Sequence, residues 1–342
     1  MPRQPRIDFP GLLHHVIVRG IERRAIFHDP RDYRDFLDRL ARLIPETGVL
    51  CYAWALMRNH VHLLLQTAST RIATLMHRLL TGYATRFNLR YNRSGHLFQN
   101  RYKDILCEEE PYFLELMRYI PLNPVRAGLI RTPEELTGYP WTSYGAVMGR
   151  ANHPWQTVGP ALERFGPDVD SARKAYRSFL VDGWNQPKQD RLEGGGLIRS
   201  LGGVAGALEA RASGERQMFD QRILGSGAFV EGVLRQAEAK ERQAERTAHA
   251  LTLEQLEKEI STLFCIKPSL LSEPGKAPAI SKAKSLLVYA GVNWLKRSLT
   301  EMGKITRIAT GAASRAYRRG RDLEPSVGLA DRLERQNSRN VP

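Results

Sequence analysis

The order of strand-like and helix-like segments in the first third of the chain restricts its fold more than any other feature. Runs rich in β-branched residues alternate with longer segments in which apolar residues recur at helical spacing. The strand-like segments are residues 13–19, 50–57, 60–66 and 102–106, and the helix-like segments are residues 29–44, 69–88 and 108–122. Their order, β-α-β-β-α-β-α, is that of the ferredoxin-like split βαβ pattern. We therefore expect an α+β fold with helices packed on one face of an antiparallel sheet.

The rest of the chain is irregular at first and then helical. Prolines and glycines interrupt residues 131–186, and the Gly-Gly-Gly run at 194–196 predicts a flexible joint, because no G-x-x-x-x-G-K-[ST] phosphate loop is present. A polar helix is expected over residues 228–249. Further helices are expected over residues 252–263, 279–297 and 308–319, with a short element at 298–302. This order and the basic last helix predict an all-α, helix-turn-helix-like domain.

The distribution of charge points to an anionic partner. The chain has 51 Lys and Arg against 36 Asp and Glu, a formal charge of +15. Residues 1–150 carry 21 basic and 14 acidic side chains, residues 251–342 carry 16 and 9, and residues 151–250 are nearly neutral. Two basic regions around a neutral one indicate two separate contacts with nucleic acid. The hydrophobic content of 42% excludes a chain that is disordered throughout.

Composition and charge together predict the domains and the compartment. We expect a first domain over residues 1–150, a helical connector over 151–250, a helical DNA-binding domain over 251–321 and a disordered tail over 322–342. No run of about 18 apolar residues is present to span a bilayer, and the N-terminus does not have the pattern of a signal peptide. The three cysteines lie far apart without a CxxC pair, which disfavours a zinc site or a disulfide framework. The sequence therefore predicts a cytoplasmic or nucleoid-associated protein with no membrane partner.

Two histidines on one predicted strand are the sharpest chemical signal. Side chains of a strand alternate between faces, so His60 and His62 project together while Val61 and Leu63 point into the core. Two imidazoles whose backbones are about 7 Å apart can converge on one divalent metal ion. Half-exposed histidines on a solvent-facing strand would have the same pattern, so both interpretations stay open at this point.

A second signal lies near the end of the predicted helix 108–122. Tyr119 and Asn123 are four residues apart and would share one face of a helix. Pro121 cannot donate a helix hydrogen bond and is expected to bend the helix where Tyr119 is displayed. A single tyrosine on a helix usually belongs to the core, but the histidine pair makes a chemical role for Tyr119 a serious alternative.

Together these residues resemble the motifs of single-tyrosine HUH transposases of the bacterial insertion-sequence type, and best of all the REP-associated tyrosine transposases. The resemblance covers about residues 7–150. It is carried by His14-His15-Val16, Arg19-Gly20, Met57-Arg58-Asn59-His60-Val61-His62, residues 95–103 and residues 119–128.

The resemblance implies that His60 and His62 bind Mg²⁺ or Mn²⁺ and that Tyr119 is the nucleophile. Asn123 stands where many relatives have a glutamine that completes the metal shell, and is a tentative third ligand. A metal ion would polarise the scissile phosphate, and attack by Tyr119 would leave a 5′-phosphotyrosine and a free 3′-OH. The implied activity is cleavage and rejoining of single-stranded or hairpin DNA in transposition. The alternatives are a domesticated DNA-binding regulator without turnover and a metal-dependent nuclease without the covalent step. A homodimer is possible, and so is a monomer.

Basic residues beside these motifs and in the last helices are candidates for DNA contacts. Residues 251–321 loosely resemble the DNA-binding domain of the bacterial chromosomal replication initiator, which implies binding to duplex DNA. Residues 276–321 contain 11 basic side chains and one acidic side chain, although a packing domain with a basic surface would have the same composition. The candidates are Arg19, Arg58, His96, Arg101, Lys103 and Arg126 in the N-terminal domain, and Lys304, Arg307, Arg315, Arg318 and Arg319 in the C-terminal domain.

Overall fold

The computed structural model describes residues 6–68, 70–186, 189–196, 200, 218–250, 252–275, 277–329 and 332–333. The chain divides into two compact units, Met1–Leu234 and Arg235–Pro342. We describe each unit by itself. None of the helices in the described ranges is both long and apolar enough to cross a membrane.

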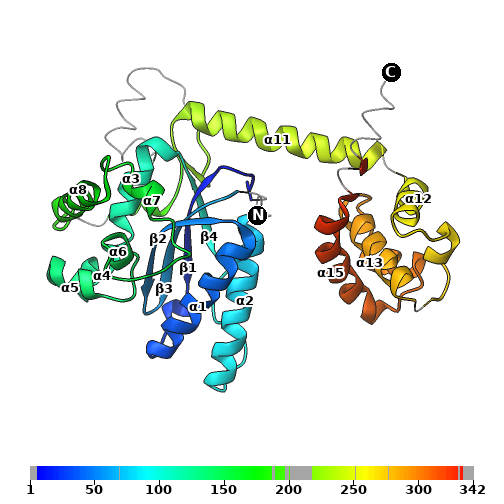
Figure 1. Cartoon of the computed structure of the whole chain (residues 1–342), viewed down its shortest axis with the longest axis horizontal. Coiled ribbons are helices and arrows are strands. Elements are labelled where there is room, and N and C mark those ends of the chain that lie inside the picture. The colour runs from blue at the N-terminus through cyan, green and yellow to red at the C-terminus, as the bar shows by residue number, and fades with distance from the viewer. Residues whose placement is uncertain are drawn as a thin grey trace. The chain divides into compact units, whose positions relative to one another are not determined.

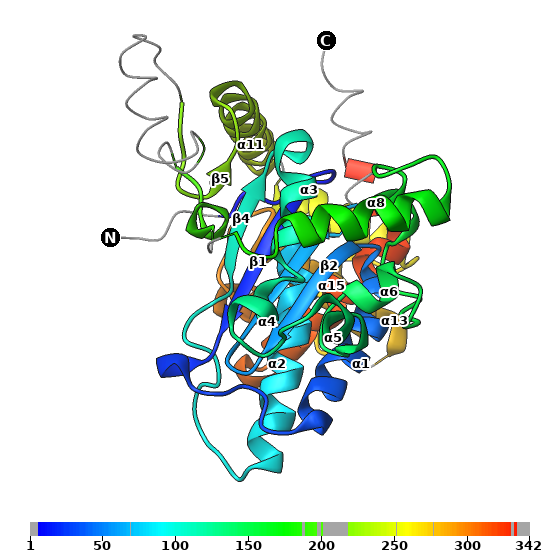
Figure 2. The same ribbon diagram turned by 90° about the vertical axis from the view of Figure 1, so that its left-hand side faces the viewer.

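The first unit is built on a five-stranded sheet with the order β2-β3-β1-β4-β5 (Figures 1 and 2). Its first four strands are β1 (Leu13–Arg19), β2 (Leu50–Met57), β3 (His60–Gln66) and β4 (Lys103–Cys107). Neighbours among these four are antiparallel, and their order is that of the ferredoxin-like sheet, so the predicted fold class is confirmed. The short β5 (Ile223–Leu224) extends the sheet beyond β4 as a parallel partner. The sequence analysis did not predict β5, because two residues do not establish an alternating pattern.

One face of the sheet is covered by α1 (Pro30–Thr47) and α2 (Ile72–Arg90), which pack against each other (Figure 1). The apolar sides of α1 and α2 form one core with the strand side chains on this face of the sheet, among them Val16, Val61 and Leu63. The predicted helix 69–88 would begin at Ser69, which lies outside the described residues. The first backbone N–H groups of α2 donate instead to the carboxylate of Asp8, which lies far away in the sequence.

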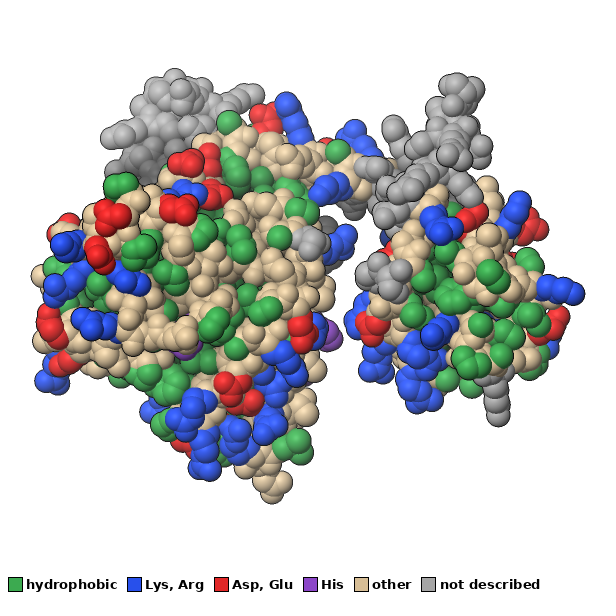
Figure 3. Space-filling view, viewed as in Figure 1, with side chains coloured by type: hydrophobic (Ala, Val, Ile, Leu, Met, Phe, Trp, Pro, Cys, Tyr) green, Lys and Arg blue, Asp and Glu red, His purple; other side chains and the backbone are tan. Residues whose placement is uncertain are grey.

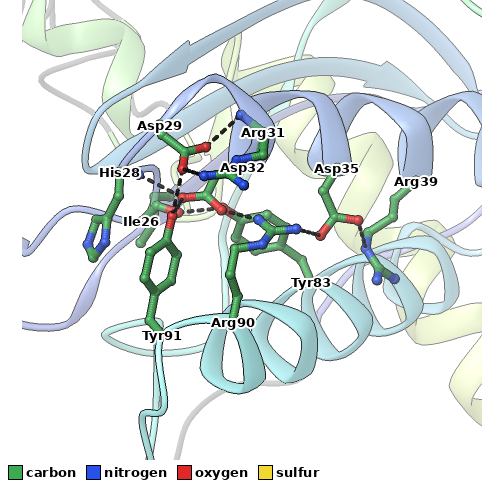
Figure 4. A network of polar contacts seen from close by, with 10 residues as sticks. All are labelled: Ile26, His28, Asp29, Arg31, Asp32, Asp35, Arg39, Tyr83, Arg90 and Tyr91. Carbon is green, nitrogen blue, oxygen red and sulfur yellow. Dashed lines mark hydrogen bonds and ion pairs between the residues drawn. The ribbon is translucent and has the colours of Figure 1, made fainter.

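A network of polar contacts joins the start of α1 to the end of α2 (Figure 4). The buried carboxylate of Asp32 accepts hydrogen bonds from the backbone N–H of His28 and the hydroxyl of Tyr91, and forms an ion pair with Arg90. Asp29 caps α1 by accepting from the N–H of Arg31. Because the buried charge of Asp32 has these partners, the network can fasten the two helices without leaving that carboxylate unpaired.

The other face of the sheet is also covered, by helices that follow β4 in the sequence (Figure 2). These helices are α3 (Glu109–Tyr119), α4 (Asn123–Arg126), α5 (Pro133–Gly138), α6 (Tyr144–Val147), α7 (Gly159–Leu162) and α8 (Val169–Asp182). The sequence analysis treated residues 131–186 as broken by prolines and glycines and did not identify α8. Its signals are the Asp168 cap and the helical spacing of Ala172, Tyr176 and Leu180, which bury one side of the helix.

The predicted helix 108–122 ends earlier than expected, at Tyr119. Pro121 has no N–H to donate to the carbonyl of Met117, so α3 stops rather than bending onward through Leu122. The hydroxyl of Tyr176 in α8 donates to this Met117 carbonyl at 2.9 Å. Pro121 therefore ends the helix at the tyrosine, and α8 satisfies the carbonyl that it leaves.

Between α8 and β5 the chain crosses the second face of the sheet as residues 189–196, which we call the strap. The strap contains the 3₁₀ turn Asp190–Glu193. Leu192 in this turn and Gly195 after it are both buried. A Cβ on Gly195 would lie 2.2 Å from the carbonyl oxygen of Ile223 in β5, so only glycine allows this approach. The glycine run, which the sequence predicted to be a flexible joint, thus packs against the sheet edge.

The second unit contains the helical domain. Its elements are the C-terminal part of α11 (Gly227–Ala250), α12 (Leu253–Leu263), the 3₁₀ turn Pro268–Leu271, α13 (Pro278–Asn293), α14 (Leu299–Ile305) and α15 (Thr310–Val327). Capping boxes at Thr252 and Ser298 start α12 and α14. α15 packs on α13 and extends into the predicted tail, most of which lies outside the described residues.

Candidate active site

Strand β3 places His60 and His62 on the face of the sheet that α3 covers. His62 lies opposite Ile17 of β1 and Ala55 of β2, both of which belong to the core on this side. The two imidazole rings have their centroids 5.1 Å apart. The intervening Val61 points to the opposite face, into the core with α1 and α2. The alternation expected from the sequence thus brings the two rings together.

His15 of β1 extends this pair to three imidazoles. Its Nε2 lies 2.9 Å from Nδ1 of His62, and its Nδ1 lies 2.8 Å from the carbonyl oxygen of Leu192 in the strap. Burial lowers the pKa of His15 to about 4, so its ring is neutral near pH 7. A carbonyl can only accept, so Nδ1 of His15 carries the proton and its Nε2 accepts from Nδ1–H of His62. This chain of bonds leaves the lone pair of a neutral His62 on Nε2.

A similar contact orients His60. Its Nδ1 lies 2.7 Å from Oδ1 of Asn59. The amide nitrogen of Asn59 donates to the carbonyl of Arg23 at 2.9 Å, which turns the amide oxygen toward the imidazole. Nδ1 of His60 is therefore the donor, and the lone pair of the neutral ring is on Nε2. Both histidines present the same nitrogen for coordination.

Tyr119 joins the histidines from the last position of α3. Its ring meets the rings of His15 and His62 edge-on, each with centroids 5.9 Å apart. The side chain is buried, and its hydroxyl donates to Oε1 of Glu193 at 2.8 Å. The guanidinium of Arg126 lies over the tyrosine ring, 4.9 Å from its centroid, and donates to the Tyr119 carbonyl. A hydroxyl, two imidazole donors and a carboxylate are thus gathered on one face of the sheet.

Asn123 contributes to this region through its amide nitrogen. That nitrogen donates to the carbonyls of Tyr119 and Ile120, at 3.0 and 3.2 Å, and so satisfies the end of α3. A role as metal ligand would have to use the amide oxygen. Within the described part of the chain, no three His, Cys, Asp or Glu side chains lie close enough to hold a metal ion. The protein therefore offers two nitrogen donors, which suits a divalent ion that takes its other ligands from substrate or water.

The sequence analysis missed two residues of this site as participants. His15 lay within a quoted motif but received no role, because nothing in a strand pattern says which of two adjacent histidines faces the pair. Glu193 lies in the strap, where the Lys103 ammonium also binds its backbone carbonyl. A single carboxylate in an irregular, glycine-rich segment carries no local signal.

The basic residues predicted to contact DNA lie around the edges of the first unit. Arg58, His96, Arg101 and Lys103 are exposed, and Arg19 and Arg126 are half-buried. A groove of about 820 Å³ runs between α2 and residues 95–102 and includes Arg6, His96 and Arg101 in its lining. These side chains are not gathered at one point: Arg126 and Lys103 contact Tyr119 and the strap beside the histidines, whereas His96 and Arg101 line the groove.

The basic residues predicted in the second unit all lie on α14, on α15 or in the turn between them. They are Lys304, Arg307, Arg315, Arg318 and Arg319, and all five are exposed. Figure 3 shows Lys and Arg side chains gathered on the part of this unit that α15 forms. The surface is strongly basic, as the sequence indicates.

Comparison with known proteins bears on the first unit. Residues 9–123 match the family described as "Transposase IS200 like". Among solved structures, the chain is similar to a REP-associated tyrosine transposase bound to a REP hairpin, with 15% identity and a TM-score of 0.37 over 49% of this chain and 93% of that one. No curated protein matches the sequence. The match confirms the family resemblance predicted from the motifs, and the matched segment contains the histidine pair and Tyr119.

Proposed function

We propose that this protein is a metal-dependent DNA strand transferase that cleaves and rejoins single-stranded or hairpin DNA through a 5′-phosphotyrosine at Tyr119. The observation that carries the proposal is the contact of the Tyr119 ring with His62, whose imidazole lies beside that of His60 on the same face of the segment that matches the transposase family. A hydroxyl nucleophile beside metal-binding nitrogens is what phosphodiester cleavage requires.

His60 and His62 are the residues that would hold Mg²⁺ or Mn²⁺, with the amide oxygen of Asn123 as the candidate third ligand. The fit rests on the hydrogen bonds to Asn59 and His15, which direct the proton of each ring to Nδ1. When bound, the ion would polarise the scissile phosphate and stabilise the negative charge that develops on it.

The chain's own residues supply the nucleophile and its position. Tyr119 would attack phosphorus through Oη and keep the cleaved linkage as a phosphotyrosine ester, so rejoining to a 3′-OH needs no nucleotide cofactor. Arg126 contacts both the backbone and the ring of Tyr119, and this holds the hydroxyl in place.

Two surfaces would bind the DNA. We place single-stranded or hairpin DNA, as in the REP-associated subgroup, against the first unit, with Arg19, Arg58, His96, Arg101, Lys103 and Arg126 as candidate phosphate contacts. The basic surface of α14 and α15 would bind duplex DNA in the manner of a helix-turn-helix module, with α15 as the second helix. Such a protein would act where the DNA is, in the cytoplasm at the nucleoid.

The test is a covalent-capture assay. Incubation with an end-labelled single-stranded hairpin and Mn²⁺ should give a protein–DNA adduct that survives denaturation, and EDTA should prevent it. Tyr119→Phe should form no adduct and still bind the hairpin, because only a hydroxyl is removed. Tyr144→Phe is a matched control, since Tyr144 is buried on the same side of the sheet and makes no ring contact with the histidines.

The outcomes separate the alternatives. Binding without cleavage under any divalent metal would favour a regulator without turnover. Metal-dependent cleavage without an adduct would favour a nuclease that uses water as its nucleophile. An adduct that persists in Tyr119→Phe would overturn the assignment of the nucleophile.

A further inference from the structure

We propose that Glu193 is a catalytic residue that accepts the proton of Tyr119 when the tyrosine attacks DNA. The inference rests on the proposed function, since it concerns the same cleavage step. Glu193 lies 70 positions beyond the segment that matches the transposase family, which ends at residue 123. It therefore lies outside the segment that matches the family model.

The geometry joins Glu193 directly to the reacting atom. Oη of Tyr119 donates to Oε1 of Glu193 at 2.8 Å, within the reach required of a general base. The carboxylate is half-buried beside a fully buried tyrosine ring.

The strap holds this carboxylate in place from several sides. Leu192 is fully buried, and its carbonyl accepts from Nδ1–H of His15. The backbone carbonyl of Glu193 accepts from the ammonium of Lys103 in β4. Gly195 and Gly196 donate to the carbonyls of Gln221 and Ile223 beside the sheet edge. The backbone on both sides of Glu193 is therefore anchored to the sheet, as a positioned base requires.

The neighbouring imidazoles are less suited to receive this proton. Both nitrogens of His15 are engaged, one as a donor to Leu192 and the other as an acceptor from His62. His62 carries its proton on Nδ1 and presents Nε2 to the metal ion in the proposed site.

The proposed step balances in protons and electrons. The proton of Tyr119 moves from Oη to the Glu193 carboxylate while an Oη electron pair forms the bond to phosphorus. The bond from phosphorus to the 3′ oxygen breaks, and its electron pair stays on that oxygen, which takes a proton from water. Glu193 then releases its proton to water. Rejoining runs the same sequence in reverse, with Glu193 returning a proton to Tyr119.

The experiment measures the single-turnover rate of adduct formation on the labelled hairpin with Mn²⁺. Glu193→Gln keeps the shape and the hydrogen bond but cannot take a proton, so its rate should fall by about 10²-fold or more. Hairpin affinity and the thermal midpoint should remain close to those of the wild type. Glu134→Gln is the matched control, because Glu134 is an exposed carboxylate paired with Arg177 on the surface.

A second variant keeps the test independent of packing changes. Glu193→Ala opens space beside the hydroxyl, and added formate should restore part of the adduct rate, because a small carboxylate can replace the missing base. Formate should not restore Tyr119→Phe.

Three outcomes would contradict the inference. A Glu193→Gln rate within a few-fold of the wild type, without rescue of Glu193→Ala, would show that Glu193 takes no part in the chemistry. A faster rate in Glu193→Gln would show that the strap obstructs Tyr119. Absence of any adduct in the wild type would overturn the proposed function itself, and with it the role of Glu193.

Discussion

The two faces of the sheet use the same strands for different purposes. On the side of α1 and α2, β3 contributes Val61 and Leu63 to an apolar core, and the polar contacts of that layer lie at the helix ends (Figure 4). On the side of α3, the same strand contributes His60 and His62, and the core surrounds a connected group of imidazoles, a phenol and a carboxylate. Adjacent residues of one strand thus belong to a packing surface and to a chemical one.

The two faces differ in the polar side chains that they bury, and in the proposed function those of the second face serve chemistry rather than stability. Burying polar groups is costly unless each finds a partner. On the second face a chain of contacts runs from Asn59 to His60 and from Leu192 through His15 to His62. Substitutions on the first face should therefore reduce stability, and those on the second face should reduce activity. The following predictions test that separation.

The largest effect is expected at His60. His60→Ala removes one of two nitrogen donors, and single-turnover cleavage in Mn²⁺ should fall by about 10³-fold, which corresponds to several kcal/mol of lost transition-state stabilisation. Hairpin binding should change little. Quenched-flow cleavage assays on the same labelled hairpin would measure the rate, and undiminished cleavage by this variant or in EDTA would refute metal binding by the pair.

A substitution on the face covered by α1 and α2 should instead reduce stability, by a free energy of similar size. Leu63 is fully buried under α1 and α2, so Leu63→Ala should lower the free energy of unfolding of the first unit by about 2–5 kcal/mol. Urea denaturation followed by tryptophan fluorescence would measure it. The cleavage rate of the folded variant should stay within a few-fold of the wild type. A variant that loses cleavage without losing stability would show that the faces are not independent.

The neighbouring pair His14 and His15 sharpens the comparison, because their side chains point to opposite faces. His15→Phe removes the acceptor that orients His62, and the affinity for Mn²⁺ measured by calorimetry should fall by about 10- to 100-fold. His14→Phe breaks the contact with the carboxylate of Asp104, 2.8 Å away, so it should lower stability instead. Equal Mn²⁺ affinities for the two variants would contradict the orienting role of His15.

The smallest effect is expected for duplex DNA binding by the basic surface of α15, which belongs to neither face of the sheet. Replacing Arg315 and Arg318 of α15 by alanine should reduce the slope of log K against log salt for duplex DNA by about 2, because each lost phosphate contact removes about 0.9. Hairpin cleavage by the first unit should be unchanged. Arg242→Ala in α11 is the control, since Arg242 is exposed and paired with Glu238. An unchanged slope in the double variant would favour a packing or protein-partner role for α15.

Much of the first unit could be predicted because its pattern is local. The alternation around His60 and His62 and the helical spacing of α1 and α2 are visible in short windows, and the structure has the strand order that they predict. The family assignment follows from motifs of the same kind, and the match over residues 9–123 confirms it.

The parts that sequence analysis missed depend on contacts between distant segments. α2 is capped by Asp8, and the carbonyl freed by Pro121 is satisfied by Tyr176. Glu193 reaches Tyr119 only because the strap crosses the sheet and pairs beside β5. No propensity or periodicity records such a meeting, which is why the carboxylate at the tyrosine became visible only in the structure.

The central claim is that Tyr119 becomes covalently attached to DNA. The most direct measurement is mass spectrometry of the adduct after nuclease and protease digestion, with fragmentation to locate the modified residue. The account predicts a nucleotide attached through its 5′ phosphate to the peptide that contains Tyr119, formed only with a divalent metal. Attachment at any other tyrosine, or a cleaved hairpin with no modified peptide, would contradict it.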